Sequence, residues 1–243
     1  MHHRPADRPE TAWPHPYSLM LFTRYPVAGQ TKTRMIPHLG PEGAAALQRQ
    51  MTEYILNEMT KAARHLPLAV EVHFSGGSLA QMQTWLGDRP SVTYQPQVAG
   101  TLGDRLIAAF CQSFDSDHFE AGRLGTGRPG AIAIGSDCPA LGLDHLIAAV
   151  EALQRVDVAI GPATDGGYYL IGLAQPQPAL FQTIDWGTER VLAQTLAAAT
   201  AQGLSVDLLA PLTDVDLPED LPEWEHILAK SNLKPLGSTG PTG

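Results

Sequence analysis

Short apolar runs alternate with longer amphipathic segments along most of the chain. Runs of small, β-branched and aromatic residues predict strands at 17–24, 69–74, 91–95, 131–135, 156–162, 168–172 and 205–209. Apolar residues that recur every three or four positions predict helices at about 41–64, 79–86, 102–114, 143–154 and 189–201. A last helix is expected to begin at Pro218, because proline is favoured in a first helical turn. This alternation predicts an α/β fold.

The predicted strand at 131–135 is an uninterrupted run of small and β-branched residues, which is typical of a strand buried on both faces. Asp137 follows this run, and Pro139 ends it. Ligands of open α/β sheets bind beyond the carboxyl ends of the strands. Asp137 is therefore the first candidate functional residue, and a cap or turn role is the alternative.

The 243 residues, 44% of them hydrophobic, are enough for one sizeable α/β domain or two small ones. We expect one domain at 17–231. The polar segment 1–16 and the Gly-, Pro-, Ser- and Thr-rich segment 232–243 are expected to be disordered. The glycine-rich stretch 115–130 is expected to be an exposed, mobile connection within the domain.

Charge and cysteine usage narrow the class of protein. The net charge of -9 argues against a nucleic acid as the main partner, because such binding rests on clustered positive charge, but a small anion stays compatible. The two cysteines, Cys111 and Cys138, form no CxxC pair and favour a reducing compartment. Since no stretch approaches the roughly 18 apolar residues of a membrane span, we expect a soluble cytoplasmic protein.

A basic loop follows the first predicted strand. Pro26 and Gly29 break regular structure there, and Lys32 and Arg34 add two cations beyond the strand end. Such a loop can hold the phosphates of a nucleotide, but an ordinary solvated basic turn explains it equally well.

Two glycine-containing segments can also be interpreted either as ligand-binding segments or as structural turns and caps. Gly100 and Gly103 permit close approach of a ligand to the backbone, or they belong to a helix start capped by Thr101. The sequence Asp165-Gly166-Gly167 fits a tight hairpin, or a site in which the neighbouring tyrosines stack on a base or sugar.

Polar residues also mark the start of the last two helices. Thr188 is expected to cap the helix at 189–201. Asp214 and Asp216 alternate along an extended piece and should point to one side, whereas Asp220 is expected to serve the positive end of the terminal helix.

A set of short motifs carries a family resemblance that runs from about residue 18 to 224. In chain order, they are Arg24-Tyr25-Pro26-Val27-Ala28-Gly29 with Lys32-Thr33-Arg34, Gly100-Thr101-Leu102-Gly103-Asp104-Arg105, Gly135-Ser136-Asp137-Cys138-Pro139, Gly161-Pro162-Ala163-Thr164-Asp165-Gly166-Gly167-Tyr168-Tyr169, Trp186-Gly187-Thr188 and Asp214-Val215-Asp216. Together they resemble a family of GT-A-type, glycosyltransferase-like proteins that is described by similarity as arsenosugar biosynthesis glycosyltransferases. That family is related to phospholactate guanylyltransferase and to molybdenum-cofactor nucleotidyltransferases.

The resemblance implies a nucleotide-diphospho-sugar transferase fold (GT-A, Rossmann-like), with a mostly parallel sheet flanked by helices. It implies that Asp137 binds Mg²⁺ or Mn²⁺, and Asp216 is the candidate second ligand because Ser136-Asp137 carries one carboxylate where the family pattern has two. Arg24 stands where a lysine is usual, which keeps the charge but changes the donor geometry. The implied nucleotide and phosphate ligands are Arg24, Gly29, Lys32, Arg34, Gly103 and Arg105. Asp165 is the candidate catalytic residue, and the candidates for sugar or acceptor binding are Gly166, Gly167, Tyr168, Trp186 and Thr188.

Two enzyme chemistries fit this scaffold. A glycosyltransferase takes a nucleotide-sugar and transfers the sugar to a small-molecule acceptor; a guanylyltransferase-like enzyme takes a nucleoside triphosphate and releases pyrophosphate. The hairpin and Trp-Gly-Thr motifs favour glycosyl transfer. A non-catalytic nucleotide-binding module is the third hypothesis, and the sequence leaves acceptor and oligomeric state undetermined.

Overall fold

The computed structural model describes residues 16–114 and 129–231. The predicted terminal segments and most of the predicted connection at 115–130 lie outside the described residues. The strands are β1 Tyr17–Arg24, β2 Leu68–Ser75, β3 Val92–Pro96, β4 Ala131–Gly135, β5 Val158–Pro162, β6 Tyr168–Leu173 and β7 Val206–Leu208. The α-helices are α1 Ile36–Ala62, α2 Leu79–Leu86, α3 Leu102–Phe114, α4 Leu143–Leu153, α5 Val191–Ala201 and α6 Leu221–Ser231, and short 3-10 turns lie at η1 Thr33–Met35, η3 Pro178–Phe181 and η4 Pro218–Asp220.

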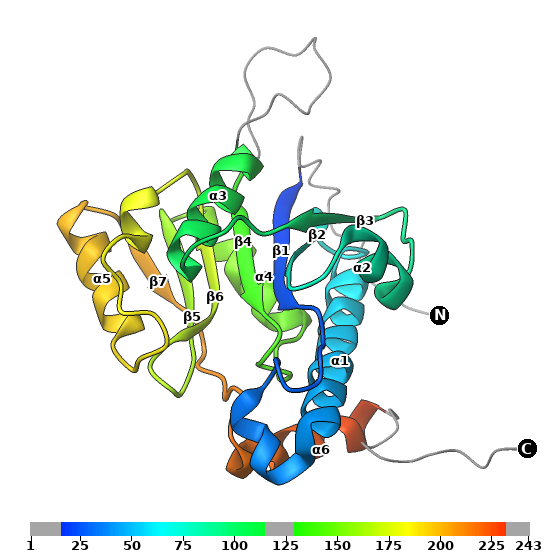
Figure 1. The fold of residues 1–243 in the computed structure, drawn as a ribbon. Helices are drawn as coiled ribbons and strands as arrows, with labels where there is room; N and C mark the ends of the chain where they lie inside the picture. The colour runs from blue at the N-terminus through cyan, green and yellow to red at the C-terminus, as the bar shows by residue number, and fades with distance from the viewer. Residues whose placement is uncertain (1–15, 115–128, 232–243) are drawn as a thin grey trace, which may run out of the picture.

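All seven strands form one sheet in the order β3-β2-β1-β4-β6-β5-β7 (Figure 1). β6 runs antiparallel to β4 and to β5, whereas the other neighbouring pairs are parallel. The predicted mostly parallel sheet is therefore confirmed. The chain builds outward from β1 to β3 and then crosses back to place β4 on the other side of β1. A reversal of this kind is where open α/β sheets bind ligands.

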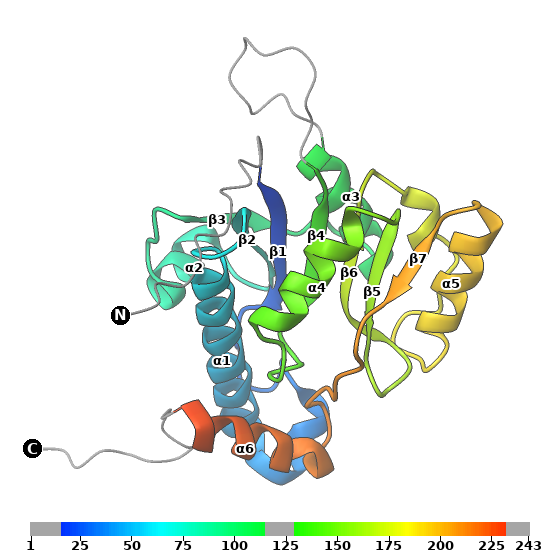
Figure 2. The ribbon, with the colours of Figure 1, turned by 180° about the vertical axis from the view of Figure 1, so that it is seen from behind.

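Helices cover both faces of the sheet. α3 and α5 lie in front of it in Figure 1, and the reverse view in Figure 2 shows α1 and α4 over the opposite face. None of the helices within 16–114 and 129–231 is both long enough and apolar enough to cross a membrane.

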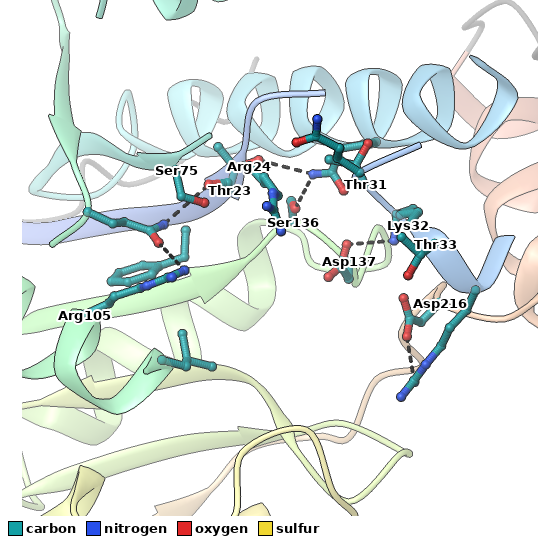
Figure 3. A pocket seen from close by; sticks show the side chains of 16 residues that line it. Thr23, Arg24, Thr31, Lys32, Thr33, Ser75, Arg105, Ser136, Asp137 and Asp216 are labelled. Carbon is teal, nitrogen blue, oxygen red and sulfur yellow. Dashed lines mark hydrogen bonds and ion pairs between the residues drawn. The ribbon is translucent and has the colours of Figure 1, made fainter. Parts of the chain in front are cut away.

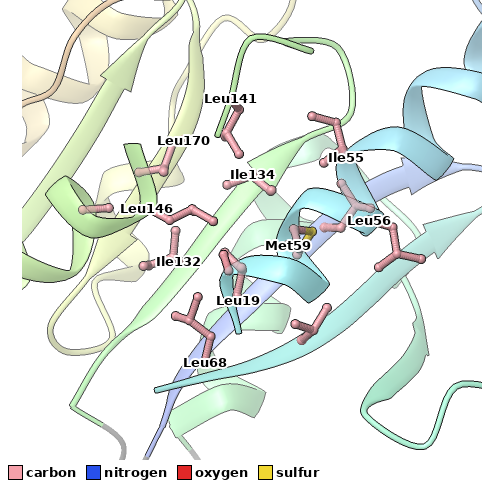
Figure 4. Packing of buried hydrophobic residues seen from close by; sticks show 14 of the residues in the cluster. Leu19, Ile55, Leu56, Met59, Leu68, Ile132, Ile134, Leu141, Leu146 and Leu170 are labelled. Atoms are coloured by element: carbon pink, nitrogen blue, oxygen red, sulfur yellow. The ribbon is translucent and has the colours of Figure 1, made fainter. Parts of the chain in front are cut away.

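The strand β4 is buried on both faces, as its composition predicts. Ile132 and Ile134 pack with α1 and α4, where Leu19 of β1 and Met59 of α1 belong to the same cluster (Figure 4). Ala133 packs on the other face with α3 and α5. The residues that follow β4 are thus held in place by two cores.

A third cluster fixes the C-terminal helix to the first one. Trp224 of α6 packs with Leu47 and Met51 of α1 and with Val215. This contact brings the segment around Val215 beside the loop that follows β1. Asp220 accepts hydrogen bonds from the backbone N–H of Asp216 (3.1 Å) and Leu217 (2.7 Å), which confirms that it serves the start of η4 and α6.

Two helix starts differ from prediction. α1 begins at Ile36 rather than near 41, because two helical pieces join across Gly40, whose φ of 70° lies outside the helical region. The predicted capping position at Thr188 is wrong, because α5 begins at Val191 with Arg190 in the capping position. The Thr188 hydroxyl donates to the Asp185 carbonyl (2.8 Å) and accepts from Arg190 N–H (3.3 Å) in the turn before the helix.

Candidate functional site

A cavity of about 370 Å³ lies at the carboxyl ends of β1 and β4, within the size range of ligand pockets (Figure 3). It occupies the point where the strand order reverses, where the topology favours a ligand. The sequence-predicted residues that line it are Arg24, Lys32, Arg34, Arg105, Asp137 and Asp216. Six charged residues from four separate sequence motifs thus face one cavity.

The ammonium of Lys32 is hydrogen-bonded to other groups of the protein. Its Nζ donates to Oδ1 of Asp137 (2.8 Å) and to the carbonyl of Val215 (2.7 Å), and its side chain is only 3% exposed. Its backbone adopts φ 43°, a left-handed conformation that costs a non-glycine residue about 1–2 kcal/mol. Lys32 therefore ties the loop after β1 to the end of β4 and to the segment before α6.

Arg34 makes the second ion pair of the cavity. Its guanidinium lies 2.9 Å from Oδ2 of Asp216, and its side chain is 63% exposed. Arg24 also lines the cavity, whereas Gly29 forms a positive-φ turn (φ 78°) and is not part of the lining. The two candidate metal-binding carboxylates are consequently each paired with a cation from one loop.

The chemistry of the lining fits a magnesium or manganese ion only in part. Asp137 and Asp216 supply hard oxygen donors in the same cavity, and the Asp137 side chain is 49% exposed. Mg²⁺ is usually bound through one or two carboxylates together with substrate phosphates and water. No group of three or more His, Cys, Asp or Glu residues within the described residues could hold a metal. The residues fit an ion whose remaining ligands come from a phosphate.

A buried polar network forms the floor of the cavity. The amide Nε2 of Gln48 donates to the hydroxyls of Ser136 (3.1 Å), Thr52 (3.1 Å) and Thr23 (3.3 Å), and the two threonine hydroxyls lie 2.9 Å apart. The network joins α1 to the ends of β1 and β4. It holds the backbone next to Asp137, and no pattern in the sequence predicts it.

Replacing Gln48 with alanine is expected to cost about 1–3 kcal/mol of unfolding free energy, because the buried hydroxyls lose a shared donor. Gln50→Ala on the same helix is the matched control, since its buried Oε1 has no hydrogen-bond partner within the described chain. Urea unfolding of both variants measures the difference. Equal losses would contradict a stabilising role for the network.

The far end of the cavity is organised by Gln97. Its Nε2 donates to the carbonyl of His73 at the end of β2 (2.7 Å), and its Oε1 accepts from Nη1 of Arg105 (3.3 Å). Phe22 and Leu102 line the same cavity. Gln97 was missed from the sequence, although its position directly after β3 could have marked it.

The glycines of the 100–105 segment serve packing. Thr101 and Asp104 form the predicted helix cap, with the Thr101 hydroxyl accepting from Asp104 N–H (3.2 Å) and the Asp104 carboxylate accepting from Thr101 (2.8 Å). Hydrogen bonds from Thr101 lower the pKa of Asp104. A Cβ at Gly103 would lie 2.5 Å from the carbonyl oxygen of Phe181 and 2.9 Å from the Trp186 ring. Gly103 thus permits contact between α3 and η3, and it does not line the cavity.

The Asp-Gly-Gly sequence forms the predicted hairpin between β5 and β6. Oδ1 of Asp165 accepts from Gly167 N–H (2.8 Å), and Ala163 N–H donates to the Gly167 carbonyl (3.1 Å). The turn interpretation of Asp165 is therefore confirmed. Neither Asp165 nor Gly166 lines the cavity, so their predicted roles toward a substrate stay predictions.

The aromatic residues near the hairpin pack with each other. The rings of Tyr168 and Trp186 meet edge to face at 6.4 Å between centroids, and both border the core beneath α3 and α5. Burial raises the pKa of the Tyr168 phenol. These two residues and Thr188 lie outside the cavity lining, and stacking of Tyr168 on a ligand remains a prediction.

The hairpin and the end of β4 are within electrostatic range of each other. Burial and then the charge of Asp165 raise the pKa of Asp214, which is half-buried. Burial raises the pKa of the Cys138 thiol, and the charges of Asp137, Asp214 and Asp165 add to this effect. The raised pKa keeps the Cys138 thiol neutral and unreactive. Asp214 does not line the cavity, whereas Asp216 does.

Comparisons with known proteins agree with this architecture. The model of the family DUF2064, described as "Uncharacterized protein conserved in bacteria", matches residues 58–188, more than half of the chain. The matched part contains Gln97, Arg105 and Asp137, whereas the basic loop and Asp216 lie outside it. A search of curated proteins found no match.

Solved structures share the fold. A protein from Desulfovibrio desulfuricans G20, described as a "putative nucleotide-diphospho-sugar transferase", is 28% identical over 88% of each chain, with a TM-score of 0.74. The 4-diphosphocytidyl-2C-methyl-D-erythritol synthase from Anaerococcus prevotii DSM 20548 is 8% identical over 88% of this chain and 96% of its own (TM-score 0.56). The CMP:2-keto-3-deoxy-manno-octonic acid synthetase, in complex with CTP, is 11% identical over 88% and 99% (TM-score 0.53). The chain thus has the predicted nucleotide-diphospho-sugar transferase type of fold.

Proposed function

The chain belongs to the DUF2064 family, and we propose that it is a metal-dependent transferase that uses a nucleotide-activated donor, with a nucleotide-sugar as that donor. One observation carries the proposal: Lys32, Arg34, Asp137 and Asp216 meet at a single cavity where the strand order reverses. The similarity to the D. desulfuricans protein supports the choice of a nucleotide-sugar.

The cavity suits the two ends of a nucleotide donor. The base lies at the end formed by Phe22, Leu102 and Arg105, and the diphosphate lies at the end that holds the ion pairs. Arg24 and Arg34 then provide cationic donors for phosphate oxygens, and Arg34 can turn toward a ligand because it is largely exposed.

Transfer releases a diphosphate, on which negative charge grows as the bond to the sugar breaks. Asp137 and Asp216 would hold a divalent cation, which would neutralise that charge. Before a donor binds, Lys32 holds the Asp137 carboxylate at the cavity, and the Gln48 network fixes the backbone on which this carboxylate stands. Preorganised charges of this kind need no rearrangement during the reaction.

The acceptor side is proposed at the hairpin of Asp165, Gly166 and Gly167, with Tyr168, Trp186 and Thr188 nearby. Asp165 would bind a sugar hydroxyl or take the acceptor proton. The arsenosugar chemistry that the sequence resemblance implies belongs to this side and stays a prediction.

Nucleotidyl transfer with release of pyrophosphate is the second candidate. The observation that favours it is the pair of cations in one loop, which suits a triphosphate as well as a diphosphate. Both chemistries use the same cavity, so the reaction product has to decide between them.

We expect the protein to release a nucleoside diphosphate from one nucleotide-sugar when it is incubated with Mn²⁺, a panel of nucleotide-sugars and triphosphates, and a metabolite extract that supplies acceptors. Chromatography with mass detection identifies the released product, and EDTA should abolish its release. Pyrophosphate would support the second candidate instead. Donor binding without any release would contradict both and leave a binding module.

A further inference from the structure

Two cations of the cavity are paired with its two carboxylates. Lys32 pairs with Asp137 at 2.8 Å, and Arg34 pairs with Asp216 at 2.9 Å (Figure 3). The groups suited to phosphates are therefore bound to the groups suited to a metal. One oxygen of each carboxylate is engaged by a cation, so a metal that approaches either carboxylate meets a positive charge, and a phosphate that approaches either cation meets a negative one.

We propose that these two ion pairs couple metal binding to nucleotide binding, so that each ligand makes the site available to the other. When both arrive, Lys32 and Arg34 exchange carboxylate oxygens for phosphate oxygens, and Asp137 and Asp216 exchange the two cations for the metal. This inference rests on the proposed function, because it takes the cavity as the site of a metal and a diphosphate.

Lys32 opposes the binding of metal alone. Its ammonium is almost fully buried against Asp137, so a divalent cation that approaches this carboxylate meets a positive charge in a poorly solvated place. If the ammonium left Asp137 without a phosphate to accept it, the Val215 carbonyl would be its one remaining hydrogen-bond acceptor among the described residues. Breaking the pair is thus unfavourable until phosphate oxygens are present.

Arg34 acts in the same direction with a smaller effect. Its side chain is 63% exposed, so water screens its pair with Asp216 and lets the guanidinium swing away at small cost. Within the described residues, no group of three or more His, Cys, Asp or Glu side chains could hold a metal. Phosphate oxygens are therefore needed to complete the shell as well as to draw the cations away.

Thermodynamic linkage makes the coupling reciprocal: the factor by which phosphate tightens metal binding equals the factor by which metal tightens phosphate binding. Couplings of this kind typically amount to about 5- to 150-fold. Removing a residue that only held the loop in place would not increase metal affinity. An increase in the affinity for metal alone therefore distinguishes the proposed coupling from a purely structural role.

The test measures Mn²⁺ alone by electron paramagnetic resonance, and inorganic pyrophosphate alone by calorimetry in metal-free buffer. We expect Lys32→Met to bind Mn²⁺ alone about 5- to 150-fold more tightly than the unchanged protein, and to bind pyrophosphate more weakly. Arg34→Met should shift both affinities in the same directions by smaller factors. Arg155→Met is the control, because Arg155 has a similar exposure (64%) in its pair with Asp207 and does not line the cavity.

Unchanged or weaker Mn²⁺ binding in both variants would overturn the coupling. Arg34→Met decides the matter if Lys32→Met does not fold, since the exposed Arg34 side chain makes few packing contacts and thermal melting reports folding. The proposed function fails separately, through the absence of any product from the donor panel. Product release by the unchanged protein together with unchanged Mn²⁺ affinities in the variants would refute the coupling alone.

Discussion

Asp137→Asn is expected to lower the rate of metal-dependent transfer about 10²–10³-fold while the protein stays folded. The substitution removes the negative charge that would hold the cation beside the leaving diphosphate. The amide oxygen of asparagine can still accept a hydrogen bond from Nζ of Lys32, and the 49% exposed side chain makes little contribution to the core. The loss should therefore appear in catalysis and in metal-supported nucleotide binding. Thermal stability should also fall, because the almost fully buried Lys32 ammonium keeps a hydrogen-bond acceptor but loses its counter-ion.

Calorimetry with a nucleotide in the presence and absence of Mn²⁺ checks this expectation together with the rate of product release. Asp207→Asn is a suitable control: its carboxylate is 42% exposed and pairs with Arg155 away from the cavity. An Asp137→Asn protein with full Mn²⁺-supported affinity would remove Asp137 from the metal site.

The sequence predicted the position of Asp137 because one local pattern carries the information. An apolar run buried on both faces places its carboxyl end at the edge of the sheet, and the residues that follow must lie at that edge. The same reasoning located most of the helices and strands within a few residues. It failed at Gly40 and Thr188, where single backbone angles and local hydrogen bonds decide where a helix begins.

The partners of Asp137 could not be predicted in the same way. Lys32 is 105 residues away from Asp137 in the chain. Its backbone has a left-handed conformation, which a lysine does not predict. Gln48 and Gln97 are similar cases. Each is an unremarkable polar residue in sequence, and each gains its role from groups supplied by other strands.

The hairpin shows how one motif can have a structural explanation that is independent of any ligand. A Cβ at Gly166 would lie 2.3 Å from the carbonyl oxygen of Glu189, and the Gly166 carbonyl accepts a hydrogen bond from Leu192 N–H (2.9 Å). Gly166 also has φ 89°. A glycine is therefore required where the hairpin touches the start of α5, whatever the hairpin does toward a substrate.

Gly166→Ala is accordingly expected to destabilise the protein by about 2–5 kcal/mol, the sum of about 1–2 kcal/mol for the left-handed backbone and about 1–3 kcal/mol for overpacking. Gly187→Ala is the matched control, because Gly187 has a similar φ of 79° but no atom within 4 Å of the added Cβ. It should lose only the backbone part, about 1–2 kcal/mol. Urea unfolding compares the two. If Gly166→Ala is no less stable than Gly187→Ala, the contact with Glu189 is not what requires the glycine, and its presence would have to be explained by the acceptor role instead.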